Sequence, residues 1–279
     1  MVACLEVDFR DVKFIRHPGR SKMLKWCSYC QQFQGETSPY EDFAITHGLC
    51  LACESVHPDV FAVDVVRQSD LLRRVFNSLY DAGRRNDLRA AQRLVEDAVA
   101  ANCRPVDILV GVLAPLLYKI GEQWRSGDIT VAHEHEFTAF SERVIDLIER
   151  TMPRDGSPRP AGTPRFFLMN APGNAHTLAI RILALWLEGR GICVPVIVDH
   201  LDLDGLARSI VEAAPRALLI SMALADQFDS VAAISARVGA LPDGLRPKIL
   251  VGGYAVKSGM VRFMPGAELV TDISLLSVA

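Results

Sequence analysis

The sequence predicts an α/β protein: a four-helix bundle followed by a five-strand doubly wound, Rossmann-like domain, with a small cysteine-rich segment at the N-terminus. Three observations lead to this prediction. Two cysteine pairs lie in the first sixty residues, a helical pattern of apolar residues fills the middle of the chain, and short apolar runs alternate with helical patterns after it. We expect the three parts to span residues 1–60, 66–152 and 164–279.

The composition indicates a globular cytoplasmic protein. The chain has 279 residues, half of them hydrophobic, so it can bury a substantial core. Its net charge of −3 argues against direct DNA binding, which usually requires a basic surface. No apolar run is long enough to span a bilayer, and the start lacks the pattern of a secretory signal. Seven cysteines without such a signal indicate a reducing compartment, with thiols that are free or metal-bound.

The cysteine-rich segment contains two C-x-x-C pairs. Cys27-Ser28-Tyr29-Cys30 and Cys50-Leu51-Ala52-Cys53 are separated by nineteen residues. Two such pairs can complete a tetrahedral zinc site, in which His47 could replace one cysteine. Two alternatives stay open: buried thiols in a module with an aromatic core, and a redox-sensing dithiol. The Cys-Ser-Tyr-Cys and Thr-His-Gly-Leu-Cys elements also resemble a cysteine-rich tail found beside bacterial sensor proteins, which implies a signalling context.

Four helical patterns follow between about residues 70 and 152. The first has one apolar face, and the second follows the cap-type residues Asn86-Asp87. The third begins near Pro105 and is apolar nearly all round, so it should be the most buried. After the break at Ser126-Gly127-Asp128, the fourth runs from about 129 to 149. Short connections between four helices predict an up-down bundle.

The start of the fourth helix carries a possible ligand-binding group. Val131, Glu134 and His135 share one helical face, and Trp124 precedes them across the turn. Together they form a lining suited to a flat, partly apolar ligand with polar edges. In the alternative interpretation, Trp124 closes the bundle end, while Glu134 and His135 are solvated.

A Pro/Gly-rich linker at 152–164 leads into alternating strands and helices. Strands are expected at 166–169, 193–198, 217–222, 249–251 and, more weakly, 268–271. Helices are expected at 176–188, 204–213, 227–238 and 256–263. This alternation predicts a parallel sheet covered on both faces. The chain contains no G-x-G-x-x-G fingerprint, P-loop or recognisable nucleophile motif, so dinucleotide binding and covalent catalysis find no support.

The turn after the first of these strands holds His176. The sequence Ala171-Pro172-Gly173-Asn174-Ala175-His176 joins a strand to a helix, and ligands of open α/β sheets bind beyond the carboxyl ends of the strands. A histidine in this turn can reach a bound metal, or it can be a solvated turn residue.

These motifs resemble cobalamin-binding modules over residues 70–279. Trp124, nine residues and Glu134-His135 resemble the W-x9-E-H motif of light-sensing cobalamin regulators, which also have a valine over the corrin where Val131 lies. The turn resembles their P-G-x-x-H-x-x-G loop, whose histidine ligates cobalt. The resemblance implies that Ser221 and the pair Gly252-Gly253 line the passage of the nucleotide tail. The implied cofactor-binding residues are Trp124, Val131, Glu134, His135, Asn174, His176, Thr177, Leu178, Ser221, Ala223, Gly252, Gly253 and Tyr254.

The sequence departs from this family at three positions. Asn174 stands where cobalamin enzymes have an acidic residue that polarises the histidine, so we expect a more easily displaced bond between His176 and cobalt. Ala179 replaces the last glycine of the loop. Arg125 stands where some light-sensing relatives have a second cobalt ligand, so a ligand switch requires His133 or His135.

The resemblance implies a light-responsive cobalamin sensor that acts on a regulatory protein partner, and thus a regulator rather than an enzyme. It leaves open the upper ligand (adenosyl, methyl or hydroxo) and a homo-oligomeric state. Two alternatives remain: a corrinoid protein of a methyltransferase system, and a sensor that binds haem or a bilin in or beside the same site. Asn174 fits the first alternative poorly, because a methyl carrier needs tuned cobalt chemistry.

Overall fold

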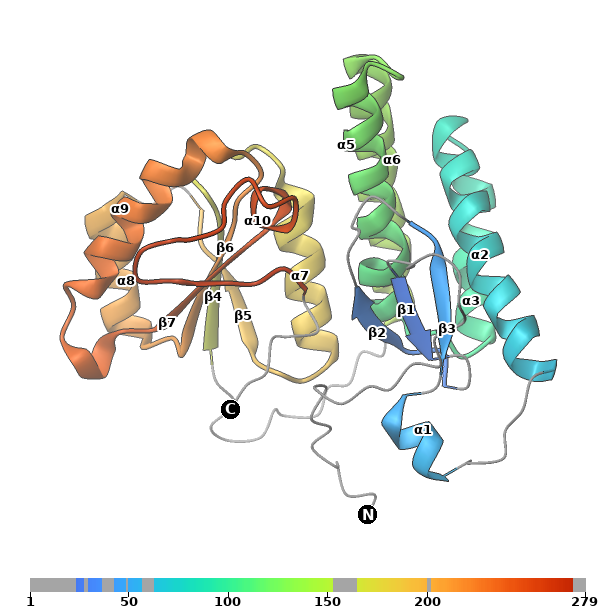
Figure 1. Ribbon diagram of the computed structural model, residues 1–279, viewed down its shortest axis with the longest axis horizontal. Coiled ribbons are helices and arrows are strands. Elements are labelled where there is room, and N and C mark those ends of the chain that lie inside the picture. The colour runs from blue at the N-terminus through green and yellow to red at the C-terminus, as the bar shows by residue number, and fades with distance from the viewer. Residues whose placement is uncertain are drawn as a thin grey trace. The chain divides into compact units, whose positions relative to one another are not determined.

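The chain divides into two compact units, Met1–Thr151 and Met152–Ala279 (Figure 1). The computed structural model describes residues 24–27, 30–36, 43–48, 50–56, 63–152, 165–199 and 202–272. The first unit contains three short strands and the helical bundle, and the second contains the parallel sheet. Nearly all of the predicted linker lies outside the described residues.

A small three-stranded sheet precedes the bundle. Its strands are β1 (Leu24–Cys27), β2 (Phe33–Glu36) and β3 (Ile45–Gly48), and helix α1 (Leu51–Val56) follows. Strand β1 lies in the middle, antiparallel to β2 and parallel to β3. The sequence analysis did not predict these strands, because they are too short to show the alternation of a half-buried strand.

The four predicted helical segments are confirmed, with one correction. They are α2 (Val63–Arg84), α3 (Leu88–Ala100), a third segment and α6 (Val131–Thr151). The third segment is not one regular helix: α4 (Pro105–Ile108) passes through a π-helical turn, η2 (Leu109–Leu113), into α5 (Ala114–Ser126). As predicted, this segment is deeply buried, since Ile108, Leu109 and Leu113 are all inaccessible to solvent.

The second unit is a doubly wound sheet of five parallel strands, as predicted. The strands are β4 (Arg165–Asn170), β5 (Val194–Ile197), β6 (Ala217–Ser221), β7 (Lys248–Gly252) and β8 (Glu268–Leu269). Their spatial order is β5-β4-β6-β7-β8, and each neighbouring pair is parallel. The helices are α7 (Thr177–Gly189), α8 (Leu203–Ala213), α9 (Phe228–Gly239) and α10 (Tyr254–Lys257), with short 3-10 turns η3 (Ala225–Gln227) and η4 (Asp243–Leu245).

The helix predicted at 256–263 is wrong in extent. Helix α10 ends at Lys257, and Gly259, at φ 75°, takes the left-handed conformation that terminates a helix. Residues 261–264 have no regular structure. Within the part of the chain that the structure describes, no helix has the length and apolarity needed to cross a bilayer.

Candidate functional site

The sheet has its topological switch point between β4 and β6. Strand β4 pairs with β5 on one side and β6 on the other, so the connections leaving β4 and β5 run in opposite directions along the sheet. Ligands of doubly wound sheets bind in the crevice beyond the carboxyl ends of the strands at this point. Asn170 and Ser221 are register partners there, at the last positions of β4 and β6. The predicted residues of this unit lie at or just beyond this edge.

The loop that carries His176 is held by the buried amide of Asn174. The Asn174 Nδ2 donates to the Ser221 carbonyl at 3.0 Å, and its Oδ1 accepts the His176 backbone N–H at 3.0 Å. Asn174 is 8% exposed, whereas His176, the N-cap of α7, is exposed. This amide therefore fixes the backbone of the loop, and neither of these hydrogen bonds involves the imidazole of His176.

The His176 imidazole has the properties of an available ligand. It forms no hydrogen bond or ion pair with the described residues, and it stands at the switch-point edge of the sheet. A neutral imidazole nitrogen is a good ligand for a transition metal such as cobalt. The donor chemistry at this edge therefore fits the cofactor that the sequence motif implies.

The loop after β6 is ordered by a residue that the sequence analysis missed. The Oε1 of Gln227 accepts the backbone N–H groups of Ala223 and Leu224 at 2.9 and 3.1 Å. Gln227 is 5% exposed, while Leu224 is 50% exposed. A glutamine six residues after the strand end gave no sequence signal, because its function depends on the turn that η3 makes.

Packing within the chain explains the two glycines at the end of β7, Gly252 and Gly253. A Cβ atom on Gly253, whose φ is 99°, would lie 2.5 Å from the Met222 carbonyl oxygen. A Cβ atom on Gly252 would lie 3.1 Å from the Val270 carbonyl oxygen. Backbone conformation and close packing therefore require glycine at position 253, whereas position 252 is only tightly packed. A role of the two glycines in ligand passage stays a prediction. Tyr254 begins α10 directly beyond them.

The bundle presents its predicted residues on both sides of one turn. Trp124 lies in the last turn of α5, Val131 is the first residue of α6, and these side chains are 50% and 49% exposed. The Glu134 side chain is 16% exposed, accepts from Thr138 Oγ1 at 2.9 Å and lies 3.6 Å from the His135 imidazole. This end of the bundle thus carries two exposed apolar residues and a largely buried carboxylate.

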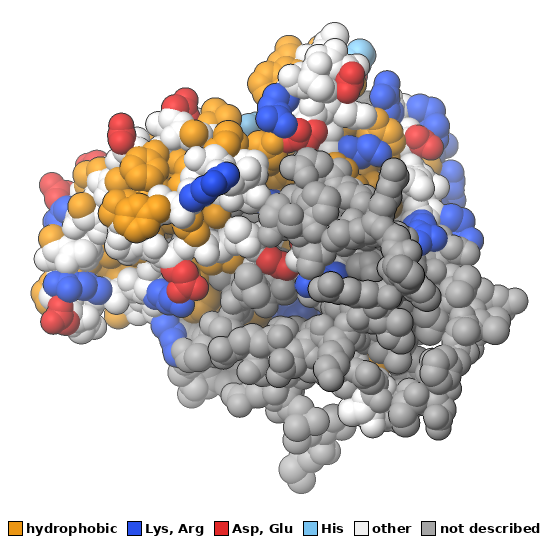
Figure 2. Space-filling model, in the orientation of Figure 1, with side chains coloured by type: hydrophobic (Ala, Val, Ile, Leu, Met, Phe, Trp, Pro, Cys, Tyr) orange, Lys and Arg blue, Asp and Glu red, His pale blue; other side chains and the backbone are white. Residues whose placement is uncertain are grey.

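Space-filling colours show that exposed apolar side chains occur in the sheet unit as well (Figure 2). The carboxyl edge contributes Leu224, and the segment after α10 contributes Met260 and Phe263, which are 46% and 70% exposed. Large apolar side chains that are exposed to solvent are common on surfaces that bind ligands or other proteins.

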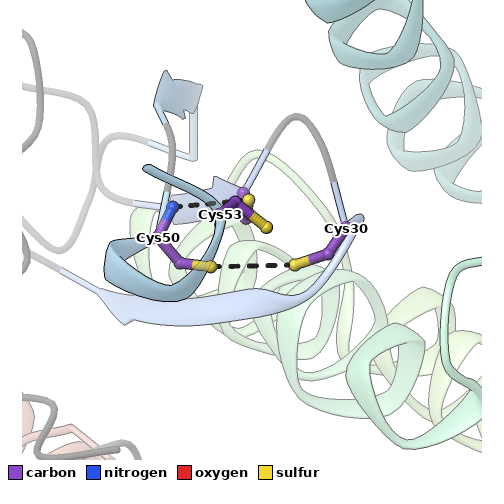
Figure 3. Close-up of side chains that lie close together, drawn as sticks. Cys30, Cys50 and Cys53 are labelled. Atoms are coloured by element: carbon purple, nitrogen blue, oxygen red, sulfur yellow. Dashed lines mark hydrogen bonds between the residues drawn. The ribbon is translucent and has the colours of Figure 1, made fainter. Parts of the chain in front are cut away.

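The four cysteines of the N-terminal module converge. Cys27 ends β1, Cys30 follows in the turn, Cys50 precedes α1 and Cys53 lies within it. Their four sulfur atoms lie within 4.8 Å of one another (Figure 3). His47 lies in β3, but its side chain is outside what the structure describes.

The electrostatics of this cluster oppose four bare thiolates. The pKa of the Cys30 thiol is raised by its hydrogen bond with Cys27, by burial and by the charges of the neighbouring sulfurs. Burial, a hydrogen bond with Cys50 and the same charges raise the pKa of Cys53 to about 12. Ionised sulfurs packed this closely therefore require a compensating cation.

The first similarity to known proteins lies in the helical bundle. Residues 75–149 match the B12 binding domain family. The chain is 29% identical over 167 residues to the HTH-type transcriptional repressor CarH of Myxococcus xanthus. That match covers 59% of this chain and 52% of the repressor, so the chain spans about half the length of this curated relative.

A solved structure shares the fold. The chain resembles the monomethylamine corrinoid protein of Methanosarcina barkeri with a TM-score of 0.57 and 16% sequence identity, over 72% of this chain and 94% of that one. The residues that match the family include most of the bundle, with Trp124 among them. The solved structure with a similar fold is that of a corrinoid protein. Residues 75–149 are therefore similar to the B12 binding domain family, and the chain shares its fold with a corrinoid protein.

Proposed function

We propose that the chain is a cobalamin-dependent, light-responsive signalling protein that acts on a regulatory protein partner. In this proposal Trp124 and Val131 of the bundle are apolar cofactor-binding residues, and His176 of the sheet unit is the cobalt ligand, as the sequence motifs imply. The resemblance of the W-x9-E-H motif to light-sensing regulators and the similarity to a transcriptional repressor support this function.

The observation that best supports this proposal concerns the faces of α5 and α6 that pack into the core. These faces extend beyond the buried part of the bundle. Trp124 lies four residues after Ile120, which is 2% exposed, so both share one face of α5. Glu134 lies seven residues before the fully buried Ser141, on the inner face of α6. Yet Trp124 is half exposed. An apolar helix face that continues from the core and stays half exposed among the described residues is suited to a flat apolar ligand.

When bound, an alkylcobalamin supplies a cobalt–carbon bond that light can cleave. In this proposal the side chains of the protein bind the cofactor and shield its cobalt–carbon bond from water. Trp124 and Val131 would shield the alkyl group of the cofactor from water, and Glu134 would offer a carboxylate that accepts a hydrogen bond from Thr138. Because Asn174 uses its Oδ1 for the His176 backbone N–H, the imidazole lacks a charged acceptor in this loop. We therefore expect a bond between His176 and cobalt that is readily displaced.

The test uses the full chain reconstituted separately with adenosylcobalamin and methylcobalamin. Visible spectra and light-scattering mass are recorded in the dark and after green light. We expect both a spectral change and a change of oligomeric state or partner binding. A chain that binds cobalamin with identical dark and illuminated spectra and mass contradicts the light-responsive part of the proposal.

Two variants assign the residues. His176→Ala should abolish the spectrum of histidine-ligated cobalt, and Arg165→Ala, an exposed change at the amino end of β4, should leave it intact. Trp124→Ala should weaken retention of the alkyl cofactor, whereas Gln92→Ala on the outer face of α3 should not. If His176→Ala keeps the wild-type cobalt spectrum, the ligand assignment is wrong.

The fold shared with a corrinoid protein supports a second candidate, a methyl-carrying component of a methyltransferase system. The two functions differ in their reactions: a methyl carrier exchanges its methyl group with a partner enzyme in the dark. Methyl transfer from the methylcobalamin-loaded chain to a thiol acceptor, catalysed by an added methyltransferase, would favour it. Spectra after expression with haem or bilin test whether another tetrapyrrole binds in or beside the site.

A further inference from the structure

We propose that Cys27, Cys30, Cys50 and Cys53 bind one structural zinc ion, and that this ion holds the N-terminal module against the π-helical turn of the bundle. This site is independent of the cobalamin proposal. The argument rests on the geometry of the sulfurs, their place in the fold and the contacts that connect them to η2.

The sulfur positions fit a tetrahedral ion. Zinc–sulfur bonds of about 2.3 Å in a tetrahedron place the sulfurs roughly 3.8 Å apart. Cys30 Sγ and Cys50 Sγ are 3.9 Å apart, and all four sulfurs lie within 4.8 Å. A disulfide requires an S–S distance of about 2.05 Å, and none of these four cysteines forms one. The arrangement therefore needs only a small contraction to coordinate zinc.

The topology explains why two distant pairs meet. Strands β1 and β3 are parallel, with Cys27 in register with Gly48, so both strands end at the same edge. The first pair follows one strand end and the second pair follows the other. The Cys50 backbone N–H donates to Cys27 Sγ at 3.4 Å, which favours a negatively charged sulfur.

The module has little other core at this edge. Cys27, Cys50 and Cys53 are 0%, 8% and 9% exposed, and the buried apolar cluster that they form contains only cysteines among the described residues. Segments of fewer than about 40 residues rarely fold without a metal, disulfides or a partner surface. A zinc ion replaces the missing apolar core and neutralises the thiolates.

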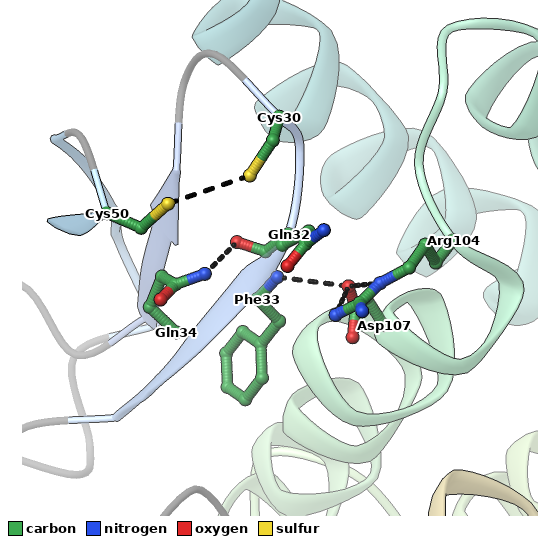
Figure 4. A network of polar contacts seen from close by, with 7 residues as sticks. All are labelled: Cys30, Gln32, Phe33, Gln34, Cys50, Arg104 and Asp107. Carbon is green, nitrogen blue, oxygen red and sulfur yellow. Dashed lines mark hydrogen bonds and ion pairs between the residues drawn. The ribbon is translucent and has the colours of Figure 1, made fainter. Parts of the chain in front are cut away.

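The same module is packed against the bundle on its other side. The Phe33 backbone N–H donates to Asp107 Oδ2 at 3.2 Å, and Arg104 Nε donates to the same oxygen at 2.7 Å (Figure 4). The Trp26 and Phe33 rings meet edge to face, 5.5 Å apart, directly over Gly111 in η2. The module is thus fixed to the π-helical turn by two rings and to α4, just before that turn, by one buried carboxylate.

The zinc ligands determine the spacing of those two rings. Trp26 precedes Cys27, and Phe33 follows Cys30 by three residues, so the turn between the first two ligands joins the two rings. The Cys27 N–H and carbonyl bond to Gln32 O and Gln31 N at 2.9 and 3.0 Å, which closes this turn. Loss of the ion would free the turn and with it the contact on η2.

The first experiment measures zinc by mass spectrometry in the full chain, purified under reducing conditions with zinc present. We expect about one zinc per chain, independent of cobalamin content. Cys27→Ser should lower zinc affinity more than about 100-fold, beyond the loss caused by an outer-shell change. Cys193→Ser, a buried cysteine of the other unit, should retain zinc. Cys53→His keeps a zinc ligand and should retain the ion if Cys27→Ser simply misfolds.

The second experiment measures hydrogen exchange across residues 105–113 before and after chelation. We expect faster exchange there on zinc removal, with unchanged exchange in β4 and β6 of the other unit. Wild-type protein that remains metal-free, with four thiols freely titratable or paired as disulfides, overturns the site. Zinc binding without any change at 105–113 on chelation overturns the proposed attachment to the bundle.

Discussion

Replacing Gly111 by alanine should loosen the N-terminal module from the bundle. A Cβ atom at this position would lie 2.3 Å from Trp26 Cζ2, 2.7 Å from Phe33 Cδ2 and 2.8 Å from Trp26 Cε2. The two rings are 0% and 3% exposed, so neither can turn into open space. Overpacking of a core costs about 1–3 kcal/mol, and three simultaneous overlaps place this change near the upper end.

Part of that cost is offset by helix propensity. Alanine in place of glycine stabilises a helix interior by about 1 kcal/mol. The net prediction for Gly111→Ala is therefore destabilisation by about 2 kcal/mol, equivalent to roughly 30-fold faster hydrogen exchange by local opening. The matched control is Gly121→Ala in α5, where no atom lies within 4 Å of the added Cβ. That variant should be neutral or stabilised by up to about 1 kcal/mol.

Hydrogen exchange measured by mass spectrometry resolves the two effects, because peptides from residues 24–36 and 105–116 report the contact itself. Gly111→Ala should accelerate exchange in both peptides, and Gly121→Ala should accelerate it in neither. Equal or slower exchange in Gly111→Ala would show that the rings do not pack against η2, and would remove the connection on which the zinc proposal depends.

Three further changes have defined outcomes. Gly253→Ala forces a side chain to φ 99° and to 2.5 Å from a neighbouring backbone oxygen, so thermal unfolding should shift downward, unlike Gly239→Ala, whose Cβ meets nothing within 4 Å. Asn174→Ala removes two hydrogen bonds, one to the Ser221 carbonyl, which keeps the Ala171 N–H, and one from the His176 N–H, and should cost about 1–3 kcal/mol in a denaturation experiment. Burial, with a smaller contribution from the Asp107 charge, raises the pKa of Cys103 from 9.0 to about 12. The folded state favours the neutral Cys103 thiol, so its contribution to the free energy of unfolding is complete below pH 9 and is lost as the pH rises from 9 to 12. In thermal unfolding scans, Cys103→Ala should therefore lose less stability than the wild type over that pH range.

The sequence predicted the helices of the bundle and the strands of the parallel sheet because their signals are local. Apolar periodicity located the four helical segments, and continuous apolar runs located the five parallel strands, of which only the weakest, Glu268–Leu269, is much shorter than expected. The Asp87 cap is also as expected: its carboxylate accepts from Ala90 N at 2.9 Å. The convergence of two C-x-x-C pairs follows from metal-site spacing and needed no knowledge of the strands.

Features that depend on distant partners were not predictable. The segment 105–120 is apolar nearly all round, and such a pattern cannot distinguish i→i+4 from i→i+5 hydrogen bonding, so the π-helical turn gave no signal. Asp107 is a charged residue in an apolar run, yet it is fully buried because Arg104 and the Phe33 N–H both bond to it. The Phe33 contact comes from 74 residues away in sequence, beyond any local pattern.

The π-helical turn connects these two kinds of feature. Helix α5 begins directly where η2 ends, and an additional residue per turn in η2 rotates every later side chain by about 100° relative to an uninterrupted α-helix. The face of α5 that carries Ile120 and Trp124 is therefore set by η2. The rings of the cysteine module hold that same turn at Gly111. Residues that the sequence motif assigns to cofactor binding thus depend, through one helix, on a module whose role no local motif in the bundle reveals.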